Sequence, residues 1–191
     1  MFDVGAHVGN RVASFRRLGA RVIAIEPQRA MVRTLRLLYG RDRSVTIEAV
    51  AVGGQPGRAR MLINPDNPTV SSVSSAFVTA AEGAPGWEGQ RWSEFAEVEV
   101  TTLDALIARH GVPAFIKIDV EGFELPVVQG AVETLQRCRP LILVEQAGNE
   151  EKHFGRPRDE ASAFLEDLGM ELHPDAPVMK NDRLYRFKEV R

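Results

Sequence analysis

The chain has 191 residues, of which 44% are hydrophobic and 26% charged, and this balance is typical of one soluble globular domain. Its net charge of −2, with Lys and Arg spread along the chain, lacks the basic footprint of a nucleic-acid binder, and its one cysteine, Cys138, excludes an intrachain disulfide. Neither a membrane-spanning apolar stretch nor a signal peptide is present, so we expect a cytoplasmic protein without membrane insertion.

Short apolar segments rich in Val and Ile alternate along the chain with segments of helical period. The predicted strands cover residues 2–4, 21–26, 45–52, 97–101, 115–119, 141–145, 172–173 and 183–190. The predicted helices cover about residues 10–18, 31–39, 103–109, 125–135 and 158–168. This alternation predicts a single α/β domain over 1–191, with a mostly parallel sheet, helices on both faces and an antiparallel pair closing the C-terminus.

Residues 64–95 differ in composition, being rich in Pro, Ser, Gly and Glu. A long irregular stretch inside a compact domain is usually a lid or a binding loop. Disorder is the alternative, but Phe77, Trp87, Trp92 and Phe95 indicate that part of the stretch packs. We therefore expect a lid or an acceptor-contacting insertion here.

The first strand is followed by a glycine motif, Asp3-x-Gly5-x-x-x-Gly9, and then by a helix. Ligands of open α/β sheets bind at the carboxyl ends of the strands, and glycines allow the backbone to approach a ligand closely. A dinucleotide fold requires Gly-x-Gly-x-x-Gly, but His7 and Asn10 stand where its second and third glycines belong. The spacing favours an adenosyl ligand without a pyrophosphate; the alternative is that these glycines only shape a turn.

Glu26 closes the second strand and is followed by Pro27, which suits the first turn of a helix. A carboxylate at this position can accept hydrogen bonds from both vicinal hydroxyls of a ribose. The alternative is a solvated acid at a strand end.

Lys117 stands inside an apolar strand, and Asp119 and Glu121 follow at its carboxyl end. Buried charges need partners, so packing alone explains this pattern poorly. Glu145 ends the neighbouring strand and is expected beside these acids. The alternatives are that Lys117 only pairs with an acid and that Glu124 only caps the next helix.

No metal site is expected, because the histidines at 7, 110, 153 and 173 lack the close spacing of a zinc site. The chain also has no Gly-x-Ser-x-Gly elbow and no phosphate-binding loop of the Gly-x-x-x-x-Gly-Lys type.

Six motifs in a fixed order carry a family likeness. They are FDVGAHVG at 2–9, IEP at 25–27, AVAVG at 49–53, TLD at 102–104, IKIDVEGFE at 116–124 and LVE at 143–145. Together they resemble the FkbM family of class I methyltransferases, and the motif at 116–124 is the most specific. The family has a Rossmann-like fold with a seven-stranded sheet, S-adenosyl-L-methionine as methyl donor, and O-methylation of sugars or other secondary metabolites as its usual chemistry.

The resemblance implies a role for particular residues. Expected at the donor are Asp3, Gly5, Ala6, His7, Gly9, Asn10, Glu26, Pro27, Ala51, Val52 and Asp119. His7 stands where an Asn is common in the family. The chain also opens directly on its first strand, so we expect that it lacks the N-terminal element that helps members to enclose the site.

Methyl transfer to a hydroxyl needs in-line positioning and removal of a proton. Asp119 is the first candidate base, with Glu121 and Glu145 next and Lys117 orienting them. The expected acceptor is a small molecule or a glycan. The alternatives are a non-catalytic or truncated domain that only binds the donor, and an NAD-dependent oxidoreductase.

Overall fold

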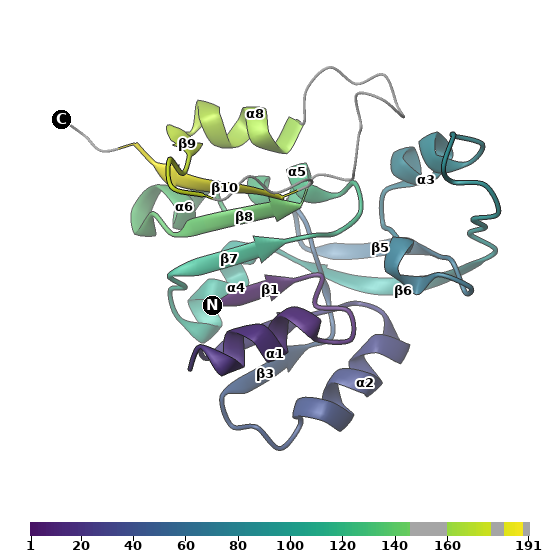
Figure 1. Ribbon diagram of the computed structural model, residues 1–191, viewed down its shortest axis with the longest axis horizontal. Coiled ribbons are helices and arrows are strands. Elements are labelled where there is room, and N and C mark those ends of the chain that lie inside the picture. The colour runs from purple at the N-terminus through teal and green to yellow at the C-terminus, as the bar shows by residue number, and fades with distance from the viewer. Residues whose placement is uncertain (146–159, 177–181, 189–191) are drawn as a thin grey trace.

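A computed structural model describes residues 1–145, 160–176 and 182–188 (Figure 1). The strands of its main sheet are β1 Phe2–Val4, β2 Val22–Ile25, β3 Val45–Glu48, β7 Phe115–Ile118, β8 Leu141–Glu145, β9 Met170–Leu172 and β10 Asp182–Phe187. Their order in space is β3-β2-β1-β7-β8-β10-β9. Neighbours from β3 to β8 run parallel, whereas β10 is antiparallel to both β8 and β9. The predicted α/β fold with a seven-stranded, mostly parallel sheet and an antiparallel C-terminal strand is confirmed.

Both faces of the main sheet are buried, as the alternation of side chains along β2 shows. Ile23 and Ile25 belong to the larger core, whereas Val22 and Ala24 belong to a second core on the other face. Successive side chains of a strand point to opposite faces, so helices must cover both. The strand therefore reads as a continuous apolar run rather than as an alternating one.

The helices flank the sheet in two groups (Figure 1). Helices α1 Asn10–Arg17 and α2 Arg29–Tyr39 contribute Val12 and Leu35 to the smaller core. The larger core receives side chains from four further helices, which are α4 Leu103–His110, α5 Glu124–Gln129, α6 Val132–Cys138 and α8 Glu160–Asp167. None of the helices in the described ranges is long and apolar enough to span a membrane.

A second, three-stranded sheet has the order β4-β6-β5, formed by β4 Ala51–Val52, β6 Glu94–Thr101 and β5 Gly57–Ile63. The predicted single strand over 45–52 was therefore wrong, because it is divided between the two sheets. Glu26 donates its N–H to the Glu48 carbonyl, but Pro27 has no N–H to continue the ladder. The chain beyond Glu48 pairs with β6 instead.

Strand β5 was not predicted, although it alternates polar and apolar residues. Arg58 and Arg60 are exposed, and Met61 is buried in a small core with Val98 and Val100 of β6. The strand predicted over 97–101 is longer and begins at Glu94. Its place is in the second sheet, not in the main one.

The single helix predicted over 125–135 is two helices, α5 and α6. A Cβ at Gly130 would overlap the Gly53 carbonyl oxygen, so the chain turns here around a close backbone contact. Asp104 then accepts hydrogen bonds from the N–H groups of Glu133 (3.2 Å) and Thr134 (2.9 Å) in the first turn of α6. This side-chain contact starts a new helix.

Candidate functional site

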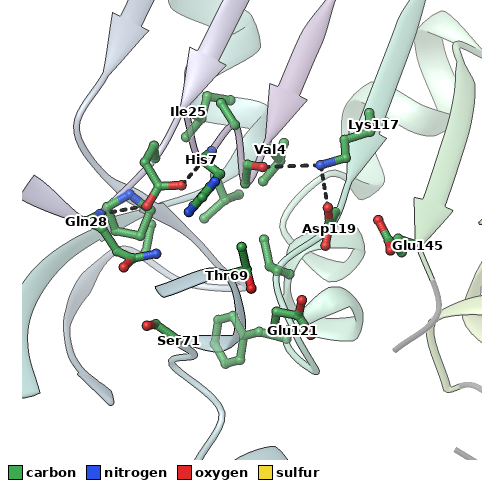
Figure 2. A pocket seen from close by; sticks show the side chains of 18 of the residues that line it. Val4, His7, Ile25, Gln28, Thr69, Ser71, Lys117, Asp119, Glu121 and Glu145 are labelled. Atoms are coloured by element: carbon green, nitrogen blue, oxygen red, sulfur yellow. Dashed lines mark hydrogen bonds and ion pairs between the residues drawn. The ribbon is translucent and has the colours of Figure 1, made fainter. Parts of the chain in front are cut away.

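One pocket of about 410 Å³ opens at the carboxyl ends of β1, β2 and β7 (Figure 2). The strand order changes direction at β1, because β2 lies on one side of it and β7 on the other. Such a switch point is where open α/β sheets bind their ligands. The volume is within the range of small-molecule sites.

The turn after β1 brings the backbone of two strand ends into contact. Gly5 has a φ of +78°, and a Cβ there would overlap the backbone oxygen of Asp119 at the end of β7. Gly9 has a φ of +89°, and a Cβ there would lie 2.5 Å from the Tyr39 ring, whose hydroxyl donates to the Gly9 carbonyl at 2.9 Å. Only glycine fits at either position. These two glycines therefore shape the turn, because a side chain at either position would clash with its neighbours.

Glu26 lies at the end of β2 and is only 3% exposed. Its Oε2 accepts the His7 N–H at 2.9 Å, and its Oε1 accepts the Gln28 N–H at 2.8 Å. Burial raises the pKa of Glu26 to about 7, although both hydrogen bonds oppose the shift. Each carboxylate oxygen can accept a second hydrogen bond. The loops after β1 and β2 thus hold a carboxylate in place at the pocket.

The His7 side chain lies in the pocket wall (Figure 2), and its backbone N–H is the group that Glu26 accepts. Its backbone is left-handed, with a φ of +47°, and its Nε2 is buried without a hydrogen-bond partner. Burial lowers the pKa of the imidazole, so the ring is neutral at pH 7. A neutral ring nitrogen can accept or donate one hydrogen bond to a ligand.

Lys117 is buried and links three groups below the pocket. Its Nζ donates to Asp119 Oδ2 at 2.7 Å and to the Gly5 carbonyl at 3.2 Å, and it lies 3.6 Å from Asp3 Oδ1. Burial lowers the pKa of Lys117, but the charges of Asp119 and Asp3 outweigh it and raise that pKa above its ordinary value. Lys117 is therefore a cation that fixes the orientation of Asp119.

Asp3 is fully buried, and neither of its carboxylate oxygens has a hydrogen-bond partner. Burial raises the pKa of Asp3 to about 6, and the charge of Lys117 partly offsets the shift. Because Asp3 does not line the pocket, it can reach a ligand only through Lys117.

Three carboxyl groups gather at the ends of β7 and β8: Asp119, Glu121 and Glu145 (Figure 2). Burial raises the pKa of Glu121 to about 8, and the charge of Asp119 adds to the shift. Burial also raises the pKa of Glu145 to about 7, with further contributions from the charge of Asp119 and a hydrogen bond to it. This end of the pocket is rich in acids and has Lys117 as its cation, an environment that favours a positively charged ligand.

Glu124 stabilises the loop before α5 and does not cap that helix as the alternative prediction held. Its Oε1 accepts the N–H groups of Val120 (3.1 Å) and Gly122 (3.2 Å), and burial raises the pKa of Glu124 to about 7. These bonds hold the loop that carries Glu121, whose φ of +52° is left-handed.

The facing wall of the pocket comes from residues 68–73, which include the 3₁₀ helix η1 Pro68–Val70. Gln28 Nε2 donates to the Pro68 carbonyl at 3.1 Å, and Ser72 Oγ donates to the Glu121 carbonyl at 2.6 Å. The segment is thus tied to the loops after β2 and β7. Part of the insertion predicted at 64–95 is packed against the pocket; whether it acts as a lid stays a prediction.

The profile of the Methyltransferase FkbM domain matches residues 3–185, which is nearly the whole chain. The chain belongs to the FkbM methyltransferase family. No curated protein matches the sequence.

Two solved structures resemble this FkbM chain. One is the methyltransferase FkbM from Methylobacillus flagellatus KT, with a TM-score of 0.62 and 19% identity over 98% of this chain and 43% of that one. The other is precorrin-6y C5,15-methyltransferase from Geobacter metallireducens GS-15, with a TM-score of 0.49 and 14% identity over 99% of this chain and 78% of that one. The first likeness shows a shared fold, and the present chain spans less than half the length of that protein.

Most residues predicted for the FkbM site lie together around the pocket. Lining it are Gly5, Ala6, His7, Asn10, Glu26, Pro27, Ala51, Val52, Lys117, Asp119, Glu121 and Glu145. Asp3 and Gly9 are not among the lining residues. Asp3 lies beside Lys117, and Gly9 packs against Tyr39; contact of either residue with the donor stays a prediction.

Sequence reasoning missed several lining residues of the FkbM pocket. Gln28, Thr69 and Ser71 add polar groups, and Met61 and Phe123 add apolar surface. Gln28 follows the recognised IEP motif directly, which was a usable signal. Nothing in the local pattern showed that Met61 would reach the pocket, because β5 itself was unforeseen.

In the described part of the chain, no group of three or more His, Cys, Asp or Glu side chains is arranged to hold a metal ion.

Proposed function

We propose that this chain is an S-adenosyl-L-methionine-dependent methyltransferase that methylates a hydroxyl group of a small molecule or a glycan. The observation that carries the proposal is the composition of the pocket. It joins a buried carboxylate, Glu26, at one strand end to an acid-rich region around Asp119 at another. The membership in the FkbM family supports the same chemistry.

Glu26 fits the ribose of an adenosyl ligand. Both of its oxygens are held by backbone N–H groups, so the carboxylate is oriented before a ligand arrives. The remaining lone pairs can accept hydrogen bonds from two vicinal hydroxyls. A preoriented acceptor loses little conformational entropy on binding.

Apolar side chains of the pocket that also holds Glu26 and Asp119 fit a purine ring. Ile25, Val50, Val52 and Phe123 line the pocket. Ala51 and Val52 were expected at the donor, and their place in the pocket wall supports a position beside its adenine.

The acid-rich end fits a ligand that carries positive charge. When bound, the donor supplies a methyl group on a sulfonium, which is already a good leaving group. Asp119 and its neighbours favour such a cation by charge. The chain itself therefore needs only to position the acceptor, keep water out and take up a proton.

Asp119 and Glu145 provide a place for that proton. Lys117 fixes Asp119 Oδ2, and Glu145 lines the same pocket, where Asp119 helps to raise its pKa. The ionised Asp119 carboxylate can take the proton of an acceptor hydroxyl while the acceptor oxygen bonds to the methyl group and the methyl–sulfur bond breaks. The neighbouring Glu145 can then share the proton that Asp119 has taken up. Asp119 is the proposed base, Glu145 its partner and Lys117 the positioning residue.

The test is turnover of S-adenosyl-L-methionine with a panel of sugar and secondary-metabolite hydroxyls, read as formation of S-adenosylhomocysteine and a methylated product by mass spectrometry. We expect Asp119→Asn to lower kcat at least about 100-fold, which is typical for loss of a general base. Asp66→Asn is the matched control, because Asp66 is exposed and outside the pocket. Full turnover in Asp119→Asn would show that Asp119 is not the base.

A further inference from the structure

A second cavity of about 410 Å³ lies outside the main pocket, in the loop between α3 Ser75–Ala81 and β6. In Figure 1 this loop lies at the edge of the molecule, away from the main sheet. None of the lining residues of the second cavity, which fall within 82–93, lines the main pocket. The FkbM motifs do not account for it.

The floor of this cavity is aromatic. Trp92 is 9% exposed and Trp87 is half-buried, and their ring centroids lie 6.2 Å apart with an angle of 30° between the planes. Phe77 supports both rings edge-on, at 5.5 Å from Trp87 and 6.3 Å from Trp92. Trp92 Nε1 donates to the Val70 carbonyl at 2.8 Å, which fixes the orientation of that ring.

The rim of the cavity is polar. Glu82, Glu88 and Arg91 are exposed, and Gln90 is half-buried. Gln90 Oε1 accepts hydrogen bonds from Asn64 (2.8 Å) and Asn67 (3.3 Å), so the amide is fixed in orientation with its Nε2 left as a donor. The rim thus offers both donors and acceptors around an apolar floor.

We propose that this cavity, defined by Trp87, Trp92 and the rim Glu82, Glu88, Gln90 and Arg91, binds a saccharide. A pyranose ring has an apolar C–H face and a circle of hydroxyl groups, which match a rigid indole floor and a rim of mixed donors and acceptors. A purely apolar ligand would leave the charged rim desolvated and unpaired. A polyanion would meet two carboxylates against one guanidinium, which disfavours it.

The saccharide cavity is connected to the main pocket through residues 69–71. The Val70 carbonyl holds Trp92, while Thr69 and Ser71 on either side of it line the main pocket. Saccharide binding does not depend on the proposed methyl transfer. Its use as an anchor for a glycan acceptor, whose reacting unit enters the main pocket, does rest on that proposed function.

The two tryptophans of the cavity are the only ones in the chain, so intrinsic tryptophan fluorescence reports on this site alone. The experiment titrates the protein with cellohexaose, maltohexaose and chitohexaose, and with an uncharged hexapeptide as control. We expect a saturable change in emission with at least one of the hexasaccharides and none with the peptide.

Trp87→Ala should weaken this binding at least tenfold, with Trp92 remaining as the reporter. The matched control is Phe95→Ala, which removes another exposed aromatic side chain, at 58% exposure, from outside the cavity. It should change the affinity less than twofold. Urea unfolding of both variants, which depends on neither ligand, shows that each is folded.

Three results would overturn the proposal: no saturable response to any hexasaccharide, an equal response to the peptide, or equal weakening by both substitutions. Failure of the proposed function gives a different pattern. In that case saccharides still bind, and S-adenosylhomocysteine does not bind to the wild-type protein.

Discussion

At the scale of single residues, the pocket depends on how closely Gly5 approaches the backbone of Asp119. The contact joins the ends of β1 and β7, and it places the Gly5 carbonyl where Lys117 can donate to it. A side chain at this position would separate the two strand ends. Glycine is needed here for space as well as for conformation.

The need for space and the need for a left-handed backbone at Gly5 can be separated by comparing substitutions of Gly5 and Gly19. Both glycines have nearly the same φ, +78° and +79°, but a Cβ at Gly19 has no heavy atom within 4 Å. Gly19→Ala should lower the free energy of unfolding by about 1–2 kcal/mol, the cost of left-handed backbone alone. Gly5→Ala should lower it by at least about 4 kcal/mol, since the clash adds to that strain. Equal losses in urea unfolding would show that the contact does not matter.

The site residues that could be recognised from the sequence lie in or at the end of an apolar strand. Glu26, Lys117, Asp119 and Glu145 could be placed because each follows or interrupts an apolar strand. The role of Asp3 could not, because its burial behind Lys117 depends on three strands packing together. Charge pairing across strands leaves no local signal in the sequence.

At the scale of elements, residues 68–73 form a wall held at both ends by hydrogen bonds to loops of the main sheet. Ser72 is 1% exposed; its Oγ donates to the Glu121 carbonyl and accepts the Ser74 N–H at 2.9 Å. The hydroxyl therefore joins the insertion to the loop that carries Glu121.

Ser72→Ala should lower the free energy of unfolding by about 1–2 kcal/mol, because it removes the partner of a part-buried carbonyl and of a part-buried N–H. The matched control is Ser75→Ala, since Ser75 is exposed in the first turn of α3, and its loss should change stability by less than about 0.5 kcal/mol. Urea unfolding measures both. A Ser72 variant as stable as the control would show that the wall is not held through this hydroxyl.

The parallel strands of the main sheet were predictable because most are apolar runs bounded by turn residues, and β8 was placed at its observed ends. The antiparallel strands were placed less well: β9 covers Met170–Leu172 instead of 172–173, and residues 189–190 of the strand predicted over 183–190 lie outside the described ranges. The second sheet was not predictable in this way. Its β4 follows β3 without a turn signal that marks a change of sheet, and β5 is mostly polar on its exposed face. Where a chain passes from one sheet to another depends on which partner strand still has unpaired backbone N–H groups.

At the scale of the whole molecule, the described core holds several buried carboxyl groups whose pKa values lie far above those of an unfolded chain. Burial raises the pKa of Asp3 to about 6, that of Glu26, Glu124 and Glu145 to about 7, and that of Glu121 to about 8. The folded protein therefore binds more protons than the unfolded chain between about pH 4 and pH 8. Stability must fall as the pH rises through this range.

We expect the free energy of unfolding without ligand to decrease by at least about 2 kcal/mol from pH 5.5 to pH 8, since Glu26 alone, with its pKa raised to about 7, accounts for that much at about 1.4 kcal/mol for each pH unit below its pKa. Urea unfolding at several pH values measures the change. A saturating concentration of a cationic adenosyl ligand should reduce the slope. Stability that rises with pH over this range would contradict the assignment of buried acids.

The central claim is that the pocket binds an adenosyl ligand through Glu26, and thermal unfolding tests it most directly. S-adenosyl-L-methionine or S-adenosylhomocysteine at a hundred times its dissociation constant should stabilise the fold by about 2.7 kcal/mol and raise Tm by about 5–10 °C, with no shift from NAD. Glu26→Gln should remove most of the shift. Glu48→Gln is the control, because Glu48 also ends a strand but pairs with His110 outside the pocket, and it should keep the shift. No shift with either adenosyl ligand, or an equal shift in Glu26→Gln, would contradict the claim.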